Sequence, residues 1–340
     1  MTSSLPSSMK ALLQPAYGLP EVLQVGTVPV PVPADDQLRI RVVAAGLNKG
    51  DWHLLTGTPL LVRLMGYGFS RPTRPTPGMA VAGVVDAVGA KVQAFRVGDA
   101  VFGEINRGAF ADYVCVSEKE LALKPEALSF EDAAALPVAA TTALQGLEEA
   151  GALRAGQRVL INGAAGGVGS FAVQIAKLLG AHVTGVCSSR NAELVRSLGA
   201  DEVIAYDQRE FTAGQARYDL ILDMVGNHPL AALRGVLSAE GRVVSGAGGA
   251  ENRWVGPMFG ILAGLVSNLF HRQRFVPLAN VPRPADLIRI AQWVEAGKFR
   301  PFIDRRYRLE QLPEAFQILG TGHSRGRSVV IVDSAAGREG

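Results

Sequence analysis

One segment constrains the fold of this chain more than any other, the run RVLINGAAGGVGSFAVQIAKLLG at residues 158–180. It opens with the apolar, β-branched residues of a buried strand and closes with the apolar spacing of a helix. Between the two, Gly163, Gly166 and Gly169 form a G-x-x-G-x-x-G pattern. The chain must therefore turn tightly from a strand into a helix at this point, as in a βαβ unit.

Strand and helix patterns go on alternating after this turn. HVTGVCS, EVIAY, YDLILDMVG and GRVVSGAG have the apolar runs of strands, whereas NAELVRSLG and PLAALRGVL have helical spacing. Such alternation predicts a parallel sheet with helices on both faces. We also predict one helix over FEDAAALPVAATTALQGLEEA, residues 130–150, before the first of these strands.

The rest of the chain follows a different pattern. Up to about residue 125, short strand-like runs are separated by Gly and Pro: MKALLQ, EVLQVGTVPV, QLRIRVVAAGLN, MAVAGVVDAVG, AVFGEI and AFADYVCV. This pattern predicts a β-rich domain. The C-terminal part is mixed, with a helix at DLIRIAQWVEAG and a final strand at RSVVIVD. A length of 340 residues suits two domains.

Charge and composition exclude several classes of function. The formal net charge is only +3 and the basic residues are scattered, so neither a nucleic-acid surface nor a polybasic membrane tail is expected. The apolar surroundings of Cys115 and Cys187 predict two buried thiols in a reducing compartment. MTSSLPSS lacks the features of a signal peptide, and the apolar stretch 254–270 is too short and glycine-rich for a membrane span. We therefore expect a cytoplasmic protein.

The glycine pattern predicts a site for a dinucleotide. Without Cβ atoms, the backbone lets a pyrophosphate come close, and the positive end of a helix beginning near Gly167 faces the phosphates. We expect Gly166 to need a positive φ as well. The predicted contacts in this turn are Gly163, Gly166, Gly167, Val168 and Gly169. The competing interpretation is a turn that only packs the helix on the strand.

The end of the second strand bears on the choice of cofactor. An acid there would bind a ribose 2′-hydroxyl, but HVTGVC runs into Ser188, Ser189 and Arg190. Two hydroxyls and a guanidinium suit a 2′-phosphate, so the sequence favours NADPH over NADH. Alternatively, Arg190 is a solvated residue that only starts the next helix. Further predicted cofactor contacts at the ends of later strands are Tyr206, Val225 and Gly246.

At this point the chain resembles a known family. AAGLNKGDWHLLTG, GMAVAGVVDAVG, GAFADYVCV, AALPVAATTALQGL, GQRVLINGAAGGVGSFAVQIAKLLGA and SLGADEVI resemble the medium-chain dehydrogenase/reductases of the quinone oxidoreductase branch. The resemblance implies an α/β fold in which a GroES-like β-rich domain accompanies a doubly wound Rossmann domain. The implied ranges are 1–131 and 277–340 for the first domain and 132–276 for the second. It also implies hydride transfer with a nicotinamide cofactor, near which Thr142 would lie.

The same resemblance argues against a metal. Zinc-dependent relatives carry Cys where this chain has Asn48, and His and Glu where it has Met79 and Ala80. Their further ligand would fall near Val138. None of these four side chains binds zinc well, and His53 alone cannot hold a catalytic zinc. With only two cysteines, the chain also lacks the four of a structural zinc lobe. We predict a metal-free protein.

A reductase without zinc suits acceptors that need little polarisation. A quinone or a conjugated enone delocalises the negative charge that it accepts, so hydrogen bonds and placement suffice. The N-x-x-D segment resembles the family's active-site loop and supplies Asn48, Asp51 and His53 as candidates. Asp51 has an equally good interpretation as the cap of a helix at DWHLL. Tyr67 and Lys49 are candidate proton donors.

Two apolar stretches are candidates for a lipophilic substrate pocket, residues 58–77 and the segment 254–278 after the sixth strand. Ordinary core and subunit contact is the competing interpretation of both. The sequence thus favours a zinc-independent NADPH-dependent reductase of quinones or enones, expected as a homodimer. Two alternatives stay open: a non-catalytic nucleotide-binding relative, structural or RNA-associated, and an alcohol dehydrogenase that works without zinc. The lack of a basic aromatic patch weighs against RNA.

Overall fold

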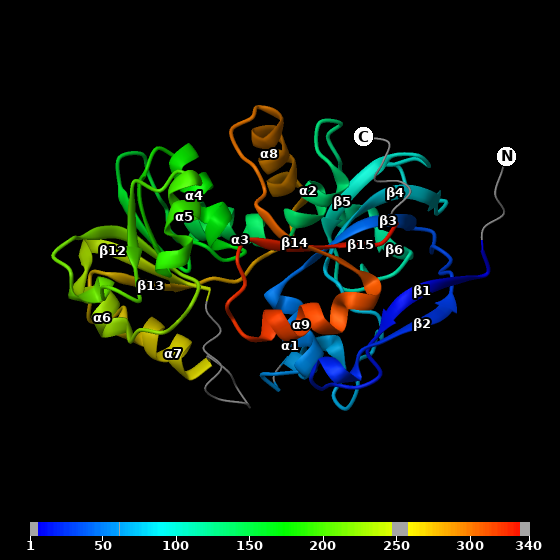
Figure 1. Cartoon of the computed structure of the whole chain (residues 1–340), viewed down its shortest axis with the longest axis horizontal. Helices are drawn as coiled ribbons and strands as arrows, with labels where there is room; N and C mark the ends of the chain where they lie inside the picture. Colours follow the sequence, from blue (N-terminus) through cyan, green and yellow to red (C-terminus); the bar gives the residue numbers. More distant parts are fainter. Residues whose placement is uncertain (1–5, 61, 247–257, 334–340) are drawn as a thin grey trace. The chain divides into compact units, whose positions relative to one another are not determined.

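The structure of the protein is a computed structural model that describes residues 6–60, 62–246 and 258–333 (Figure 1). These residues form two compact units. Unit 1 takes its described residues from Met1–Thr58, Val62–Val138 and Pro282–Gly340, and unit 2 from Pro59–Leu61 and Ala139–Val281. The boundaries expected from the sequence, after residues 131 and 276, lie a few residues before those of unit 2.

Unit 1 is built on β-strands. They are β1 (Ser8–Leu13), β2 (Gln24–Pro29), β3 (Gln37–Leu47), β4 (Ala80–Val88), β5 (Ala100–Glu104), β6 (Tyr113–Ser117), β7 (Leu121–Leu123), β14 (Ile303–Arg308) and β15 (Arg327–Ile331). β1 and β2 form an antiparallel pair. The other seven form one sheet in the order β14-β15-β3-β4-β5-β7, with β6 paired to β3. Only β14 and β15 run parallel in it.

The helices of unit 1 cover this sheet and its ends. They are α1 (Lys49–Thr56), a π-helical turn (Arg63–Tyr67), α2 (Phe130–Ala135), α8 (Pro284–Glu295) and α9 (Leu312–Gly320), with 3₁₀ turns at Pro20–Val22, Glu118–Glu120 and Leu309–Gln311. α2 packs on β3, β4 and β15, and its three alanines Ala133–Ala135 are buried. Residues from both ends of the chain share one apolar core, in which the rings of Phe110 and Phe316 meet edge to face.

The single helix predicted over residues 130–150 is wrong. The structure breaks it into α2, α3 (Ala139–Gln145) and a π-helical turn (Gly146–Ala150). Pro137 offers no N–H to continue the helical hydrogen bonds, and Val138 has φ 68°, although Leu136 before them still has helical backbone. A β-branched residue rarely adopts that conformation, so the surrounding structure must hold it there. The Val62–Val138 stretch of unit 1 ends at this break, and α3 begins the Ala139–Val281 stretch of unit 2.

Unit 2 is a doubly wound parallel sheet, and this confirms the fold class expected from the alternating pattern. Its strands are β8 (Arg158–Asn162), β9 (His182–Cys187), β10 (Glu202–Ala205), β11 (Tyr218–Asp223), β12 (Leu237–Ser245) and β13 (Arg274–Pro277). All pairs are parallel, in the order β10-β9-β8-β11-β12-β13. The order reverses direction between β8 and β11, which is where Rossmann folds bind their ligands.

Helices cover both faces of this sheet. α4 (Gly169–Leu178) and α5 (Ala192–Ser197) lie on one face, and α6 (Leu230–Gly235) and α7 (Met258–Ser267) lie on the other (Figure 1). Two further 3₁₀ turns span Ser189–Asn191 and Phe211–Ala213. One apolar cluster joins β8, β11 and β12 to α6 and includes Leu160, Ile221, Val243 and Leu233.

The apolar segment 254–278 does not follow the sixth strand, as the sequence suggested, because β13 is that strand and α7 precedes it. Residues 254–257 lie outside the described residues. α7 packs on the sheet through Gly264, against the ring of Phe275. Its large side chains are exposed, as are those just after it: Met258, Phe259, Leu262, Leu265, Val266, Leu269 and Phe270. Within the described part of the chain, no helix has both the length and the apolar character to cross a bilayer.

The two cysteines are both free thiols. Cys187 ends β9 and is buried, as expected, whereas Cys115 in β6 is only partly buried, so the expectation for it was too strong. Burial raises the pKa of the Cys115 thiol to about 11. That thiol therefore stays protonated at neutral pH and is a poor nucleophile.

Candidate functional site

The glycine turn, residues 163–169, joins the end of β8 to α4, and each of its three spaced glycines has a different reason to be glycine. Gly163 has φ 87°, which side chains resist. A Cβ on Gly169 would lie 2.1 Å from the carbonyl oxygen of Gly163. Gly166 does not have a positive φ, contrary to expectation, and a Cβ there would meet only the Gly163 oxygen, at 3.2 Å. The protein itself therefore has little need of a glycine at position 166.

The backbone of this turn presents free donors. Gly166 donates to the Gly163 oxygen at 2.9 Å, and Ser170 donates to the Gly166 oxygen at 2.9 Å. The N–H groups of Gly167, Val168 and Gly169 find no acceptor among the described residues. α4 begins at Gly169, two residues later than expected, so these donors stand at its positive end. A Cβ on Gly166 would meet one atom within 4 Å, and three N–H groups lack an acceptor among the described residues, which fits a pyrophosphate.

A polar pair that the sequence analysis missed ties the ends of the two central strands. Asn162, at the end of β8, donates through Nδ2 to Asp223 Oδ1 at 2.9 Å and to Asn227 Oδ1 at 3.0 Å. The same Asp223 oxygen accepts the N–H groups of Val225 at 3.1 Å and Gly226 at 2.9 Å. Val225 is thereby fixed beside the glycine turn, and its Cγ2 would lie 3.0 Å from a Cβ on Gly163. Polar residues at the carboxyl ends of adjacent parallel strands are the signal that was available.

The turn after β9 carries the residues predicted to select the cofactor. Ser188 Oγ accepts from Asn191 Nδ2 at 3.1 Å, and Arg190 lies in the short 3₁₀ turn Ser189–Asn191. Tyr206 is 54% exposed, and its N–H donates to the Cys187 oxygen at 2.9 Å. The expectation that no acid stands here is wrong in space, because Asp207 reaches the turn from the end of β10 and accepts hydrogen bonds from Ser189.

The last two predicted cofactor residues also belong to unit 2. Thr142 is half-buried on α3, which packs against α4. The N–H of Gly246, just after β12, donates to the backbone oxygen of Asp223 at 3.0 Å. A Cβ on Gly246 would meet the side chain of Met224 at 2.7 Å, so this glycine permits close packing.

Unit 1 carries the N-x-x-D segment. We use the name α1 corner for two residues of this segment and the side chains that hold them: Asn48, Asp51, Arg327, Arg107 and Gln14. Asn48 is the N-cap of α1, and its N–H donates to Asp51 Oδ2 at 2.8 Å. Arg327, at the start of β15, donates to Asn48 Oδ1 at 2.7 Å. Asn48 Nδ2 donates to the Gly46 oxygen at 3.1 Å. Both ends of the Asn48 amide are thus engaged, and Asp51 does cap the helix.

Burial dominates the electrostatics of this corner. Asn48, Asp51 and Arg327 are 2%, 0% and 4% exposed. Burial raises the pKa of Asp51 to about 7, against the lowering effects of the Asn48 N–H and of the Arg107 and Arg327 charges. Burial also lowers the pKa of Arg327 to about 10, and Asp51 opposes that shift. Asp51 Oδ1 has no hydrogen-bond partner among the described residues. Near neutral pH, this carboxyl is therefore protonated in part of the molecules and ionised in the rest.

Arg107 is a second buried cation that the sequence analysis did not single out. Its Nη2 donates to Gln14 Oε1 at 2.5 Å, and Gln14 Nε2 donates to the Leu55 oxygen of α1 at 2.9 Å. Its Nε and Nη1 find no partner among the described residues. Burial lowers the pKa of Arg107, and the charge of Asp51 opposes this. No local pattern marks Arg107, because its partners lie far away in the chain.

The remaining predicted catalytic residues lie on α1 and just after it. His53 Nδ1 is 3.1 Å from the Thr58 oxygen, so the neutral ring carries its proton on Nδ1 and leaves Nε2 as an acceptor. Burial is the main cause that lowers the pKa of His53. Lys49 Nζ donates to the Leu319 oxygen at 3.3 Å. Tyr67 is half-buried at the end of the π-helical turn, and its backbone oxygen accepts from Tyr17 at 2.8 Å.

The positions that hold zinc in other relatives lie in three parts of unit 1. Asn48 caps α1, Met79 and Ala80 are at the start of β4, and Val138 lies at the break after α2. The Val138 N–H donates to Glu104 Oε2 at 3.2 Å. Across residues 6–60, 62–246 and 258–333, no three His, Cys, Asp or Glu side chains gather as a metal site.

Two known protein families match parts of the chain, the first within unit 1 and the second across the end of unit 2 into unit 1. Residues 34–126 match the family described as the alcohol dehydrogenase GroES-like domain. Residues 198–330 match a family described as zinc-binding dehydrogenase.

Individual relatives match over nearly the whole chain. The chain is 36% identical over 342 residues to a 2-methylene-furan-3-one reductase of Solanum lycopersicum. This match covers 96% of this chain and 80% of the relative. It is 32% identical over 320 residues to a chloroplast envelope quinone oxidoreductase homolog of Arabidopsis thaliana, with 89% and 92% covered. Among solved structures, the quinone oxidoreductase of Coxiella burnetii gives a TM-score of 0.84 at 30% identity over 96% of this chain and 100% of that one.

Proposed function

Because the chain belongs to the medium-chain dehydrogenase/reductase superfamily, in its quinone oxidoreductase-like branch, we propose that it is a zinc-independent, NADPH-dependent reductase of quinones or α,β-unsaturated carbonyl compounds. At the coarser level, it is an oxidoreductase of a family that depends on pyridine nucleotides. A homodimer and a cytoplasmic location belong to the same proposal.

One observation carries the cofactor part of the proposal, namely the glycine turn at the reversal point of the sheet. The N–H groups of Gly167, Val168 and Gly169 have no acceptor among the described residues, and a Cβ on the adjacent Gly166 would meet only the Gly163 oxygen, at 3.2 Å. Free donors at a helix N-terminus beside an open backbone suit the two phosphates of a dinucleotide. Arg190 would add a charged contact to a 2′-phosphate, with Ser188 and Tyr206 beside it.

When bound, the nicotinamide supplies the hydride that reduces the acceptor. Thr142, Val225 and Gly246 are proposed to hold the nicotinamide end in unit 2. The Asn162–Asp223 pair keeps Val225 in place through bonds of 2.9–3.1 Å. These contacts fix the position of the reacting ring, and positioning is the main contribution that the reaction requires of the protein.

The proposed catalytic residues of unit 1, in the α1 corner and near it, have distinct roles. The engaged amide of Asn48 and the buried carboxyl of Asp51 act as positioning residues that fix the start of α1. Neutral His53 donates its Nδ1 proton to Thr58 and offers an acceptor at Nε2, so it orients a hydroxyl or water rather than supplying a proton. Tyr67 remains the proposed donor, since its phenol is only half-buried.

The choice of acceptor follows from the proposed lack of zinc. A simple ketone needs a Lewis acid or a strong proton donor, whereas a quinone or an enone spreads the accepted charge over several atoms. The residues at the zinc positions, Asn48, Met79, Ala80 and Val138, are poor zinc ligands. The apolar segments 58–77 and 258–278 are the proposed surfaces for a lipophilic acceptor.

The test is an acceptor panel measured with both cofactors. Purified protein is mixed with NADPH or NADH and with quinones, enones, simple ketones or simple alcohols, and absorbance at the nicotinamide band is followed. The proposal predicts steady oxidation of NADPH with a quinone or enone and no added metal. Tight NADPH binding without turnover on any acceptor would favour the non-catalytic alternative. Oxidation of simple alcohols would favour the alcohol dehydrogenase alternative.

A further inference from the structure

The turn after β9 contains an acid that its own sequence lacks. Asp207 follows β10, which lies parallel to β9 with Ala205 opposite Cys187. Its Oδ1 accepts the N–H of Ser189 at 2.8 Å, and its Oδ2 accepts the Ser189 hydroxyl at 2.5 Å. Since the carboxyl ends of parallel strands meet at one edge of the sheet, the fold brings this carboxylate to the turn at which the ribose end of a dinucleotide is selected.

This carboxylate is ionised and available. The two hydrogen bonds from Ser189 hold the pKa of Asp207 below its usual value. The residue is exposed, and in the described part of the chain no cationic nitrogen lies within 4.0 Å of it. Each oxygen keeps a lone pair after its bond to Ser189, so the group can accept further hydrogen bonds. Arg190, one residue along the turn, therefore does not neutralise it.

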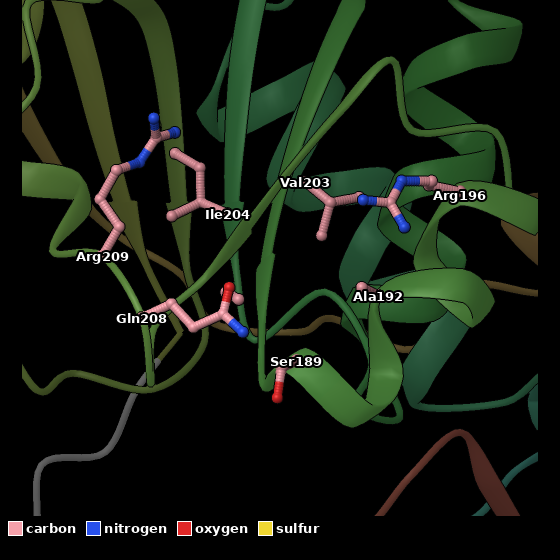
Figure 2. Close-up of a pocket in the computed structure, with 8 residues that line it drawn as sticks. Ser189, Ala192, Arg196, Val203, Ile204, Gln208 and Arg209 are labelled. Atoms are coloured by element: carbon pink, nitrogen blue, oxygen red, sulfur yellow. The ribbon is translucent and has the colours of Figure 1, made fainter.

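The turn also borders a cavity, which lies beside Ser189. A cavity of about 400 Å³ opens between α5 and the end of β10, lined by Ser189, Ala192, Arg196, Val203, Ile204, Ala205, Gln208 and Arg209. The Ser189 hydroxyl and the Gln208 amide lie near each other, whereas the Arg196 and Arg209 side chains lie away from Ser189 on opposite sides (Figure 2).

We infer that Asp207 is a cofactor-specificity residue that replaces, from the neighbouring strand, the acid which NADH-selecting Rossmann folds place at the end of the second strand. Its carboxylate accepts a hydrogen bond from a ribose 2′-hydroxyl and repels a 2′-phosphate. Arg190 acts in the opposite sense on the same turn. The two residues balance each other, so the protein binds both NADPH and NADH, with a smaller preference for NADPH than Arg190 alone would give. This inference rests on the proposed function.

Asp207→Asn separates charge from structure. The Asn Oδ1 still accepts the Ser189 N–H, and its Nδ2 donates to the Ser189 hydroxyl, so the turn is kept while the charge is lost. Dissociation constants for NADPH and NADH are measured by fluorescence titration, without any acceptor. Glu240→Gln, an exposed acid in β12 of the same unit, is the matched control for net charge. Asp207→Ala, which removes both bonds, reports on the turn itself.

We expect Asp207→Asn to tighten NADPH about threefold and to weaken NADH about threefold, as befits one exposed charge. The ratio of the two constants then shifts about tenfold, and the NADPH part of the shift shrinks at high salt. Glu240→Gln should leave the ratio unchanged. An unchanged ratio in Asp207→Asn, or equal losses for both cofactors, would overturn the inference. Wild-type protein that binds neither cofactor would instead overturn the proposed function.

Discussion

The glycine turn of unit 2 and the α1 corner of unit 1 are opposite kinds of site. In the turn, three N–H groups have no acceptor within the described part of the chain, and a Cβ on Gly166 would meet a single atom within 4 Å. In the corner, Asn48, Asp51 and Arg327 are buried, and both ends of the Asn48 amide are bonded. The turn leaves its donors available to a partner from outside. Most polar groups of the corner bond to one another, and the unpaired ones among the described residues are Asp51 Oδ1 and the Nε and Nη1 of Arg107.

This difference separates two ways in which a fold prepares a reaction. A ligand site keeps unmet hydrogen-bonding groups at its surface, and the ligand satisfies them. In a positioning site, most hydrogen-bonding groups bond to one another, and these bonds hold the backbone in one conformation. Changes in the turn should therefore affect binding more than folding, and changes in the corner should affect folding first. The exception inside the turn is Gly169, which the protein needs for itself.

The largest expected effect comes from Arg327→Met in the α1 corner. The change leaves Asn48 Oδ1 and the Ala135 oxygen without their donor, and Asp51 without one of its two cations. Breaking one side of a buried charged network costs about 3–5 kcal/mol. Urea unfolding followed by circular dichroism should show that loss. Arg325→Met is the control, since Arg325 is exposed, where it pairs with Asp304 and lies over the Phe302 ring, and about 1 kcal/mol or less is expected. Equal losses in the two variants would contradict the account.

Gly169→Ala should come next. A Cβ there would lie 2.1 Å from the Gly163 oxygen and 2.8 Å from the Ala164 Cα, both backbone atoms. The turn has to shift, at a cost of about 1–3 kcal/mol, and cofactor binding should be lost with it. Thermal unfolding measures the first effect and NADPH fluorescence the second. Gly235→Ala, where a Cβ meets nothing within 4 Å, should do neither. A Gly169→Ala variant with wild-type stability would show that the turn is softer than its geometry implies.

The pH dependence of stability should identify Asp51. Its pKa is raised in the fold from 3.8 to about 7, so the folded state holds more protons than the unfolded state between these values. Its contribution to stability is fully present below about pH 4 and is lost as pH rises through about 7. Asp51→Asn should flatten this slope in denaturant midpoints taken from pH 4 to pH 8. Asp36→Asn, on the surface, should follow wild type. A slope that persists in Asp51→Asn belongs to another group.

A further predicted effect, on binding rather than on stability, concerns Arg190 in the turn after β9. Arg190→Ala should weaken NADPH binding about tenfold to a hundredfold, because a charge-assisted phosphate contact contributes about 1.5–3 kcal/mol. NADH should bind nearly as before. Titration of both cofactors checks this, with Arg196→Ala on α5 as a nearby control. Equal losses for both cofactors would give Arg190 a structural role instead.

The glycine turn and the parallel sheet were predictable because their signals are local. A G-x-x-G-x-x-G run between a strand and a helix predicts a tight turn from the local sequence alone. The elements β8, α4 and β9 lie within a few residues of the expected positions. Even there, the sequence misassigned the positive φ, which belongs to Gly163 rather than to Gly166. Spacing identifies which glycines matter but not which constraint each one meets.

The α1 corner and the cofactor-selecting acid were not predictable in the same way, because their partners meet only in space. Arg327 reaches Asn48 across 279 positions of the chain, and Arg107 reaches Gln14 across 93. Asp207 reaches Ser189 from the next strand, so the apparent lack of an acid after β9 misled the sequence analysis. The helix predicted over 130–150 was wrong for a local reason, since the missing N–H of Pro137 and the left-handed backbone of Val138 were overlooked.

The central claim, that the glycine turn of unit 2 holds the cofactor, is tested most directly by titrating NADPH into Gly166→Ala. A Cβ at this position meets only the Gly163 oxygen, at 3.2 Å, which must shift by a few tenths of an ångström, so the variant should fold with wild-type circular dichroism and a thermal midpoint lowered far less than in Gly169→Ala. The same methyl group fills the space where the pyrophosphate approaches, so NADPH affinity should fall at least about tenfold, and further in Gly166→Val. Wild-type affinity in the folded Gly166→Ala variant would place the cofactor elsewhere and contradict the account.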